Sequence, residues 1–418
     1  METSLLAPAG ARLPCAGGAL CRARGGPLPR GHAALPPAWS VLLVLLGLLS
    51  GTACHRTREV PGTYREYAYV TNGKNNSVTV LDVLSLRAIK TLPVGRQPTG
   101  IAANARRNEV YVVNSGSDNI SFIDAERNVA TATVGVHHAP YFISVSPDGK
   151  RGYVANSGSA NVSVLDLDAR KVIANIRVGS SPGLARVSPD GSTVVVSNRA
   201  DNTVSLIDAG RLAVRATLPV CREPEDIAIL PDSSKAFVSC SGSAQVAAID
   251  LRKNGVLALL DVGKTPVSLA MKPDGGEIFV SNFTAHSVSV IETTSNEVGA
   301  TYLMGDSPVR CLVSADNSLL YVSDFGANTV VQFSIDDSAR IATVPVGSKP
   351  DALALSNDQA HLFVLDTGSG DVAVVRTTEK RYKGRGNEII SPAALETTIP
   401  TGSQPNQIVI KAFLSTGK

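Results

Sequence analysis

A four-residue motif recurs at a constant interval through most of the chain. It reads Tyr-Val-Thr-Asn in its first copy, and the copies begin at Tyr69, Tyr111, Tyr153, Val195, Phe237, Phe279, Tyr321 and Phe363. Successive copies begin 42 residues apart throughout. A period of roughly 40–45 residues with several strands in each unit is typical of the blades of a β-propeller.

Each repeat contains four strand signals, which we name A to D in chain order. Strand A follows a proline, as in residues 98–102, strand B is the recurring motif, and strand C is an alternating segment such as 162–166. Strand D runs through segments such as 89–94. Alternating β-branched residues between Asn, Gly, Asp and Pro turns predict strands, and no stretch shows a helical period of comparable strength. The predicted fold class is all-β.

Several parts of the repeat together resemble a known family. They are the Tyr-Val-Thr-Asn motif, the Val-x-Val-hydrophobic-Asp strand, the Val-Gly-x-x-Pro link and Ser-Pro-Asp-Gly turns such as residues 146–149. Over residues 64–410 the chain resembles the YVTN-type β-propeller repeat family of bacterial secreted and surface-layer proteins. The resemblance implies the fold and says little about activity, because that family is defined by its repeat. The only tryptophan is Trp39, so the WD40 pattern does not fit residues 64–410.

The two ends of the repeat region complement each other. A-type strands begin at Pro98, Pro140, Pro182, Pro224, Pro266, Pro308, Pro350 and Pro405. The last of them, residues 405–410, has no strands after it, whereas the first B, C and D strands in residues 66–94 have no A strand before them. Pairing the two ends closes the ring and removes two exposed sheet edges. We therefore predict an eight-bladed β-propeller of four-stranded antiparallel blades, closed by the C-terminal strand.

The expected domain bounds follow from this count. The propeller is predicted to be one domain over residues 66–412, with an insertion near 377–391 and a tail at 413–418. Residues 54–65 are then an N-terminal linker.

Residues 1–53 have the pattern of a cleaved signal peptide. Arginines precede the apolar run 41–49, which is too short to span a membrane, and small residues follow it. Residues 51–54, Gly-Thr-Ala-Cys, resemble the bacterial lipoprotein signal, which implies lipidation at Cys54. Simple signal cleavage suits the same residues, so both alternatives stay open. Either way we expect an exported protein, periplasmic or on the cell surface, whose membrane association depends on a lipid anchor alone.

The charge balance limits the classes of partner. Four of the 39 Lys and Arg and one of the 36 Asp and Glu fall in the first 53 residues, which leaves 35 of each sign. A nucleic-acid binder needs a clustered basic excess, so nucleic acid is not expected as a partner. The partners that remain are an envelope protein, a glycan or a small ligand. The chain is expected to be a monomer.

One face of the ring varies more than the other. D–A links and B–C loops share that face, and propeller ligands bind where such loops converge on the channel mouth. The varied loop positions also include Lys74, Arg96, Arg199, Phe283 and Phe325. The candidate ligand-binding residues are His137, His138, Tyr141, Phe142, Arg186, Arg222, Glu225, Asp226, Arg310 and Asp351. The alternative is that these residues are merely solvated, or that Arg186, Asp226 and Arg310 neutralise one another across the channel.

Two link positions depart from the glycine that other repeats carry. His137 and Cys221 stand where the links otherwise have Gly, a position that is expected to need positive φ. His137, His138, Glu225, Asp226 and Cys221 are all metal-ligand types, but no ligand spacing supports a site and none is predicted.

The cysteines leave two alternatives. Centring the 224–240 hairpin on Asp232 places Cys240 opposite Pro224, so a Cys221–Cys240 disulfide is plausible in an oxidising compartment. Two free thiols fit equally well, because sequence does not fix the distance between Cα atoms. Cys311 is expected to be buried in its A strand.

No catalytic motif accompanies the repeat. The preferred prediction is therefore a non-enzymatic binding or scaffold module at the cell envelope, with no cofactor. The alternative is an enzyme or cofactor carrier that uses the same channel mouth, as lyase, lactonase and haem d1 propellers do. The sequence contains no Cys-x-x-Cys-His, which excludes covalent c-type haem.

Overall fold

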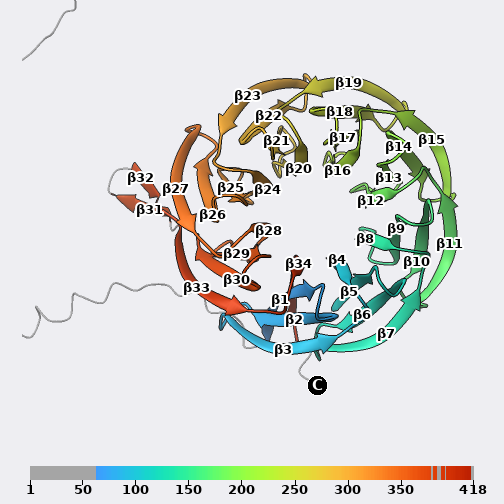
Figure 1. Cartoon of the computed structure of the whole chain (residues 1–418), viewed down its shortest axis with the longest axis horizontal. Helices are drawn as coiled ribbons and strands as arrows, with labels where there is room; N and C mark the ends of the chain where they lie inside the picture. Colours follow the sequence, from blue (N-terminus) through green and yellow to red (C-terminus); the bar gives the residue numbers. More distant parts are fainter. Residues whose placement is uncertain (1–62, 378–379, 384–386, 391, 416–418) are drawn as a thin grey trace, which may run out of the picture. The chain divides into compact units, whose positions relative to one another are not determined.

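The computed structural model describes residues 63–377, 380–383, 387–390 and 392–415. The predicted signal peptide and Cys54 lie outside the described residues. The described chain consists of strands and turns, and it contains eight four-stranded sheets arranged as the blades of a ring (Figure 1). The prediction of an all-β, eight-bladed propeller is confirmed.

The first four blades follow one another around the ring. The first blade consists of β34 (Pro405–Leu414), β1 (Tyr64–Asn72), β2 (Ser77–Asp82) and β3 (Arg87–Pro93). The second consists of β4 (Pro98–Ala103), β5 (Glu109–Asn114), β6 (Asn119–Asp124) and β7 (Val129–Gly135). The third consists of β8 (Pro140–Val145), β9 (Arg151–Asn156), β10 (Asn161–Asp166) and β11 (Lys171–Arg177). The fourth consists of β12 (Pro182–Val187), β13 (Thr193–Asn198), β14 (Thr203–Asp208) and β15 (Ala213–Pro219).

The other four blades complete the ring. The fifth consists of β16 (Pro224–Ile229), β17 (Lys235–Cys240), β18 (Gln245–Asp250) and β19 (Gly255–Asp261). The sixth consists of β20 (Pro266–Met271), β21 (Glu277–Asn282), β22 (Ser287–Glu292) and β23 (Glu297–Leu303). The seventh consists of β24 (Pro308–Val313), β25 (Leu319–Asp324), β26 (Thr329–Ser334) and β27 (Ala339–Pro345). The eighth consists of β28 (Pro350–Leu355), β29 (His361–Asp366), β30 (Asp371–Arg376) and β33 (Ala394–Pro400), and the insertion forms a separate hairpin of β31 (Lys380–Lys383) and β32 (Asn387–Ile390).

The ring is closed by its two chain ends. Strand β34 pairs antiparallel with β1, and Val70 faces Ile408 in the register. The pairing extends to Tyr64 opposite Leu414, beyond the expected strand limits. Phe413 packs its ring 6.0 Å from that of Tyr67, so the added pairs also bury an aromatic contact.

Burial changes from the channel to the rim. The B and C strands are almost wholly buried, as in β9 and β10, because each sheet packs on a neighbouring blade through both faces. The outer D strands alternate between half-buried and exposed residues, as in β11. The core therefore lies between blades: one cluster joins Tyr153 and Val164 of the third blade to Val194 and Ile207 of the fourth.

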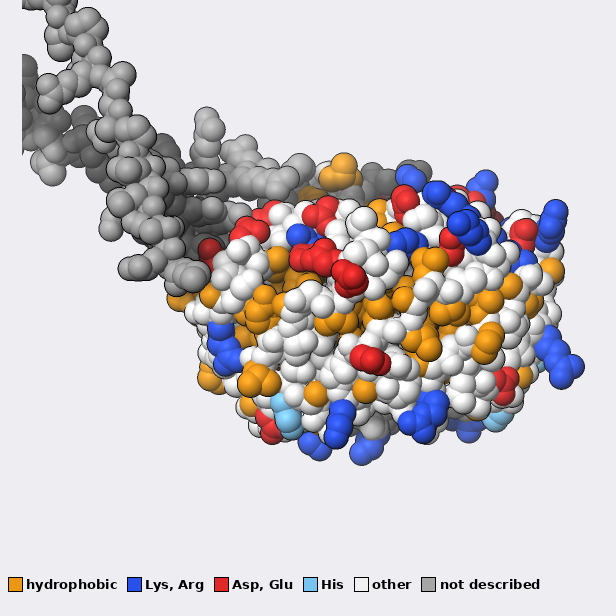
Figure 2. All heavy atoms as spheres, turned by 90° about the horizontal axis from the view of Figure 1, so that it is seen from above, with side chains coloured by type: hydrophobic (Ala, Val, Ile, Leu, Met, Phe, Trp, Pro, Cys, Tyr) orange, Lys and Arg blue, Asp and Glu red, His pale blue; other side chains and the backbone are white. Residues whose placement is uncertain are grey.

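The outer rim carries exposed apolar side chains between charged margins (Figure 2). On β19, Val256, Leu257 and Leu259 are 38%, 44% and 48% exposed. Within the part of the chain that the structure describes, there is no helix with the length and apolar character needed to cross a membrane.

Candidate functional site

A large cavity opens at the channel mouth, on the face formed by the D–A links and B–C loops. We call it the mouth cavity; its volume is about 840 Å³, and it is lined by Gly73, Lys74, Asn76, Arg96, Gln97, Thr99, Ser115, Gly116, Tyr141, Arg310, Asp351, Gln404, Asn406 and Gln407. The lining residues come from the first, second, third, seventh and eighth blades. Strands β4, β8, β24, β28 and β34 are the innermost of their blades (Figure 1). They carry Thr99, Tyr141, Arg310, Asp351, Asn406 and Gln407, and links and loops carry the other lining residues.

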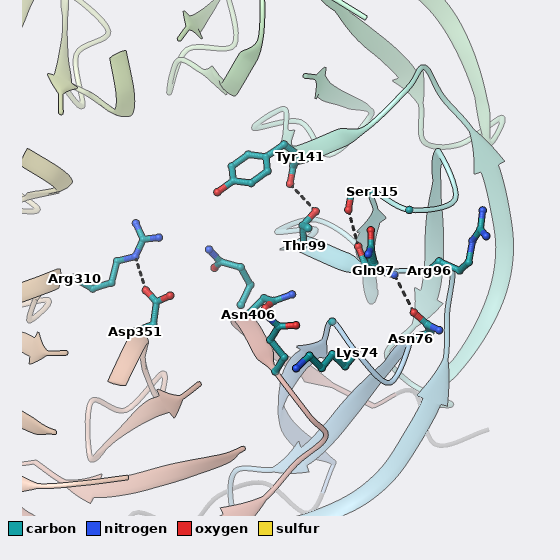
Figure 3. A pocket seen from close by; sticks show the side chains of 14 residues that line it. Lys74, Asn76, Arg96, Gln97, Thr99, Ser115, Tyr141, Arg310, Asp351 and Asn406 are labelled. Atoms are coloured by element: carbon teal, nitrogen blue, oxygen red, sulfur yellow. Dashed lines mark hydrogen bonds and ion pairs between the residues drawn. The ribbon is translucent and has the colours of Figure 1, made fainter. Parts of the chain in front are cut away.

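The cavity has cationic side chains on opposite sides. In Figure 3, Lys74 and Tyr141 extend toward the channel, Arg310 faces them from across it, and Arg96 points outward. Lys74 makes no ion pair with any described residue. The Nε atom of Arg310 lies 3.4 Å from an Asp351 carboxylate oxygen, which leaves its two terminal nitrogens directed at the channel. The arrangement presents positive charge to an anion held at the mouth.

A smaller cavity of about 110 Å³ continues from the mouth along the third to sixth blades, and we call it the channel cavity. Its lining includes Phe142, Arg186, Arg199, Glu225 and Asp226, together with Tyr141 and Arg310 of the mouth cavity.

Most of the charged side chains that line the channel cavity form ion pairs with one another. Arg186 lies 3.3 Å from Asp226, and its guanidinium carbon is 5.4 Å from the centre of the Phe142 ring. Asp226, which is 6% exposed as a residue, also accepts a hydrogen bond of 3.0 Å at its carboxylate from the backbone N–H of Leu269 in the next blade. Asp226 therefore ties the fourth, fifth and sixth blades together.

A second pair lies at the edge of the same cavity. The guanidinium of Arg199 donates to Glu225 over 2.6 Å. Burial raises the pKa of Glu225, while the charges of Arg199 and Arg310 lower it in part. The sequence left open that Arg186, Asp226 and Arg310 neutralise one another. Arg186 and Asp226 do form an ion pair, whereas Arg310 pairs with Asp351.

The structure brings most of the sequence-predicted residues together. Tyr141, Phe142, Arg186, Glu225, Asp226, Arg310 and Asp351 line one or both cavities. His137, His138 and Arg222 line neither, and the His138 Nδ1 atom lies 3.2 Å from Asp118. That these residues bind a ligand stays a prediction.

Several lining residues are absent from the candidate list, and the most informative of them is Lys74, which the sequence marked only as a varied loop position. It stands at the second position after the strand B motif, where Gly116, Gly158, Gly242, Gly326 and Gly368 stand in other blades. A long cation in a glycine position is a signal that comparison of the repeats can find. Asn406 and Gln407 converge with Lys74 only because the C-terminal strand closes the ring.

The glycines of the D–A links were expected to adopt positive φ, but most of them do not. Of the link residues at this position, Gly305 alone has positive φ, at 135°. At five of these positions a Cβ atom would lie only 2.6–2.7 Å from the last residue of a neighbouring strand B motif, so close approach requires the glycine. They are Gly95, Gly179, Gly263, Gly347 and Gly402.

The cysteine pair replaces this close approach in one blade. Cys221 takes the glycine position, Cys240 takes the Asn position of the motif, and the two form a disulfide with Cα atoms 5.6 Å apart. Cys240 faces Pro224 in the strand register. Cys311 is free and buried, and burial raises the pKa of its thiol to about 12. Among the described residues no three His, Cys, Asp or Glu side chains converge as metal ligands.

Comparison with known proteins gives three findings. Residues 104–239 match the family model described as the cytochrome D1 heme domain. The structure resembles Kuenenia stuttgartiensis hydrazine synthase at 23% identity and a TM-score of 0.56, covering 67% of this chain and 95% of that one. It also resembles the dihydro-heme d1 dehydrogenase NirN, solved in complex with DHE, at 15% identity and a TM-score of 0.66, covering 82% of this chain and 74% of that one. No curated protein sequence matches the chain.

These findings correct the preferred functional prediction. The non-enzymatic envelope binding or scaffold module is wrong, because the partial family match favours the alternative of a haem d1-type propeller. At these identities the two similar structures show the fold alone. The error has a physical reason: the groups that line the mouth come from separate blades, so no local motif marks them.

Proposed function

We propose that the protein binds a d1-type haem, or a closely related tetrapyrrole, in the mouth cavity. The observation that carries the proposal is the match of residues 104–239 to the cytochrome D1 heme domain. That segment contributes Ser115, Gly116 and Tyr141 to the mouth cavity and Phe142, Arg186 and Glu225 to the channel cavity. The matched segment therefore forms one side of the mouth cavity and part of the channel cavity.

The lining suits the periphery of such a ligand. A volume of 840 Å³ lies within the range of roughly 300–1,000 Å³ found for ligand sites. Tetrapyrroles carry carboxylates on a flat apolar ring. Lys74 and the terminal nitrogens of Arg310 would receive carboxylates from opposite sides, and Tyr141, which is 46% exposed, offers its ring to the macrocycle.

The lining supplies few groups for the iron. Among the described residues of the mouth cavity, Tyr141 is the one with a phenol, imidazole, thiol or thioether, and a phenol oxygen is a known haem ligand. A bound d1-type haem would supply redox chemistry at its iron. The protein's own part is to hold the carboxylates, to cover one side of the ring with Tyr141, and to keep Arg310 in place through Asp351.

Further parts of the proposal concern the repeat and the place of action. We propose that the blades are of the YVTN type, because the strand B motif and the Val-Gly-x-x-Pro links recur in register. We also propose that the protein is exported, with lipidation at Cys54 holding it at the cell envelope. The signal-like composition of residues 1–53 supports this placement.

The test is a titration of the purified protein with d1-type haem, followed by its absorption spectrum. We expect a saturable spectral change in the wild type. Lys74→Ala, which copies Ala200 of the fourth blade, should weaken binding roughly tenfold, because it removes a charge-assisted contact. Lys264→Ser is the matched control: it removes an exposed cation from the same face, outside both cavities.

The outcome of this titration decides the proposal. Absence of a saturable change in the wild type would overturn tetrapyrrole binding. Equal loss of affinity in Lys74→Ala and Lys264→Ser would show that general positive charge, rather than the mouth cavity, attracts the ligand.

A further inference from the structure

A second cavity adjoins the mouth cavity, and we call it the Phe325 groove. Its volume is about 470 Å³, and its lining includes Lys74, Phe325, Lys349, Ser369 and Gln404. Lys74 and Gln404 line both cavities, so the two spaces are neighbours with Lys74 between them. The groove extends the site toward the seventh and eighth blades.

Phe325 stands at a repeat position where several blades carry a hydroxyl, and Phe283 stands at the same position in the sixth blade. The position after the strand B motif carries Ser115 in the second blade and Thr367 in the eighth, and each hydroxyl donates to a link carbonyl over 2.9 Å. Phe325 makes no such bond and is only half-buried. Its ring lies 6.0 Å from that of Phe283 in the adjacent blade. An aromatic side chain therefore takes the place of a hydrogen-bonding one at the mouth face.

The charge of the groove is positive. The Lys349 Nζ atom lies 5.9 Å from the centre of the Phe325 ring. Neither Lys349 nor Lys74 pairs with a carboxylate of the described chain, and the described lining of the groove contains no acidic residue. An aromatic surface beside two uncompensated ammonium groups complements a flat, apolar ligand that carries negative charge.

We propose that the Phe325 groove is a second subsite for the ligand of the mouth cavity. It takes an apolar edge of the macrocycle against Phe325 and one carboxylate on Lys349, while Lys74 binds at the junction. This inference rests on the proposed function, since the ligand is the same tetrapyrrole. It adds that the ligand lies off the channel axis, toward the seventh and eighth blades.

Two substitutions that copy other blades test the subsite. Phe325→Ser introduces the residue that the second blade carries at the same repeat position, Ser115. Lys349→Ser introduces the residue that precedes the seventh blade at the same link position, Ser307. Each should weaken binding of d1-type haem roughly fivefold, because it removes an aromatic contact or a charge contact. The control is Lys264→Ser, for which no change is expected. Melting temperatures should stay within a few degrees of the wild type, since both side chains are outside the core.

A second probe separates this inference from the proposed function. The fluorescent anion 8-anilino-1-naphthalenesulfonate should bind the wild type saturably, bind Phe325→Ser and Lys349→Ser at least fivefold more weakly, and be displaced by one equivalent of haem. If haem binds with unchanged affinity to both variants and does not displace the probe, the subsite is overturned. If haem does not bind the wild type at all while the probe binds the groove, the proposed function fails, and with it the identity of the ligand.

Discussion

The two sides of the channel mouth use charged residues in opposite ways. Toward the fourth and fifth blades, Arg186 pairs with Asp226 and Arg199 pairs with Glu225. Toward the first blade, Lys74 extends toward the channel without a carboxylate partner in the described chain. Arg199 and Lys74 both lie in B–C loops, so the same part of the repeat carries a paired cation on one side and an unpaired one on the other.

This comparison distinguishes charged residues that stabilise the fold from charged residues that can bind a ligand. When one member of a buried ion pair is removed, the other charge is left buried without a partner. Such a removal is therefore expected to reduce stability. A charge that is exposed and unpaired contributes little to stability and remains available to an anion. The paired side is therefore expected to hold the blades together, and the open side to bind.

The largest expected effect comes from breaking the paired side. Asp226→Ala leaves the backbone N–H of Leu269 and the guanidinium of Arg186 without their acceptor. The Arg186 side chain is 42% exposed and can turn to water, so the cost comes mainly from the unpaired N–H and the lost carboxylate contacts. We expect the free energy of unfolding to fall by about 3 kcal/mol, measured by urea denaturation. Lys74→Ala, on the open side, should change it by less than about 0.5 kcal/mol.

The reverse result would remove the distinction between the two sides. If Asp226→Ala is as stable as the wild type, the Asp226 carboxylate does not tie the blades together. If Lys74→Ala is strongly destabilised, Lys74 has a structural partner and its loss of haem binding cannot be assigned to a ligand contact.

The repeat explains why the fold could be predicted so fully. A period of 42 residues fixes where each strand begins, and the unmatched ends at 66–94 and 405–410 can only be satisfied by pairing. Cys240 opposite Pro224 follows from the same symmetry of a hairpin. Such features depend on backbone pattern, which the sequence carries directly.

The site could be predicted only in part, because it depends on how side chains of different blades meet. Arg96 and His138 occupy the same repeat position, yet Arg96 lines the mouth cavity and His138 contacts Asp118. Lys74 and Arg310 are far apart in sequence and meet only across the closed ring. No local motif records such a distance, so the ligand class was first favoured by the family match.

The disulfide gives the next expected effect, also on the paired side. Cys221→Gly with Cys240→Asn restores the residues that other blades carry at these positions, so the double variant should fold. The bond closes a loop with a sequence separation of 19, and its loss should lower the free energy of unfolding by about 2–3 kcal/mol. The check is denaturation of the wild type with and without reductant. An oxidised wild type no more stable than the double variant would contradict the expectation.

The smallest expected effect on stability concerns Asp366, which, unlike Asp226, forms no ion pair with a described residue. Asp366 ends the strand B motif of the eighth blade, where Asn114 stands in the second, and one of its oxygens has no hydrogen-bond partner in the described structure. Burial, with the nearby charge of Asp371, raises the pKa of Asp366 to about 8. The folded state therefore keeps this proton up to about pH 8, whereas the unfolded chain releases it near its usual pKa of about 4.

The sign of the pH effect follows from these two values. Because the folded state binds the proton more tightly, the stability contributed by protonated Asp366 is present below about pH 4 and is lost as pH rises through about 8. Asp366→Asn cannot titrate, and its amide can donate to Asp371 as the Asn114 amide donates to Asn119 over 2.8 Å. We expect Asp366→Asn to be more stable than the wild type by at least about 1 kcal/mol at pH 9, with the gain shrinking toward pH 5. Urea denaturation at pH 5, 7 and 9 checks this; a gain that is constant with pH would show that Asp366 is not protonated in the folded protein.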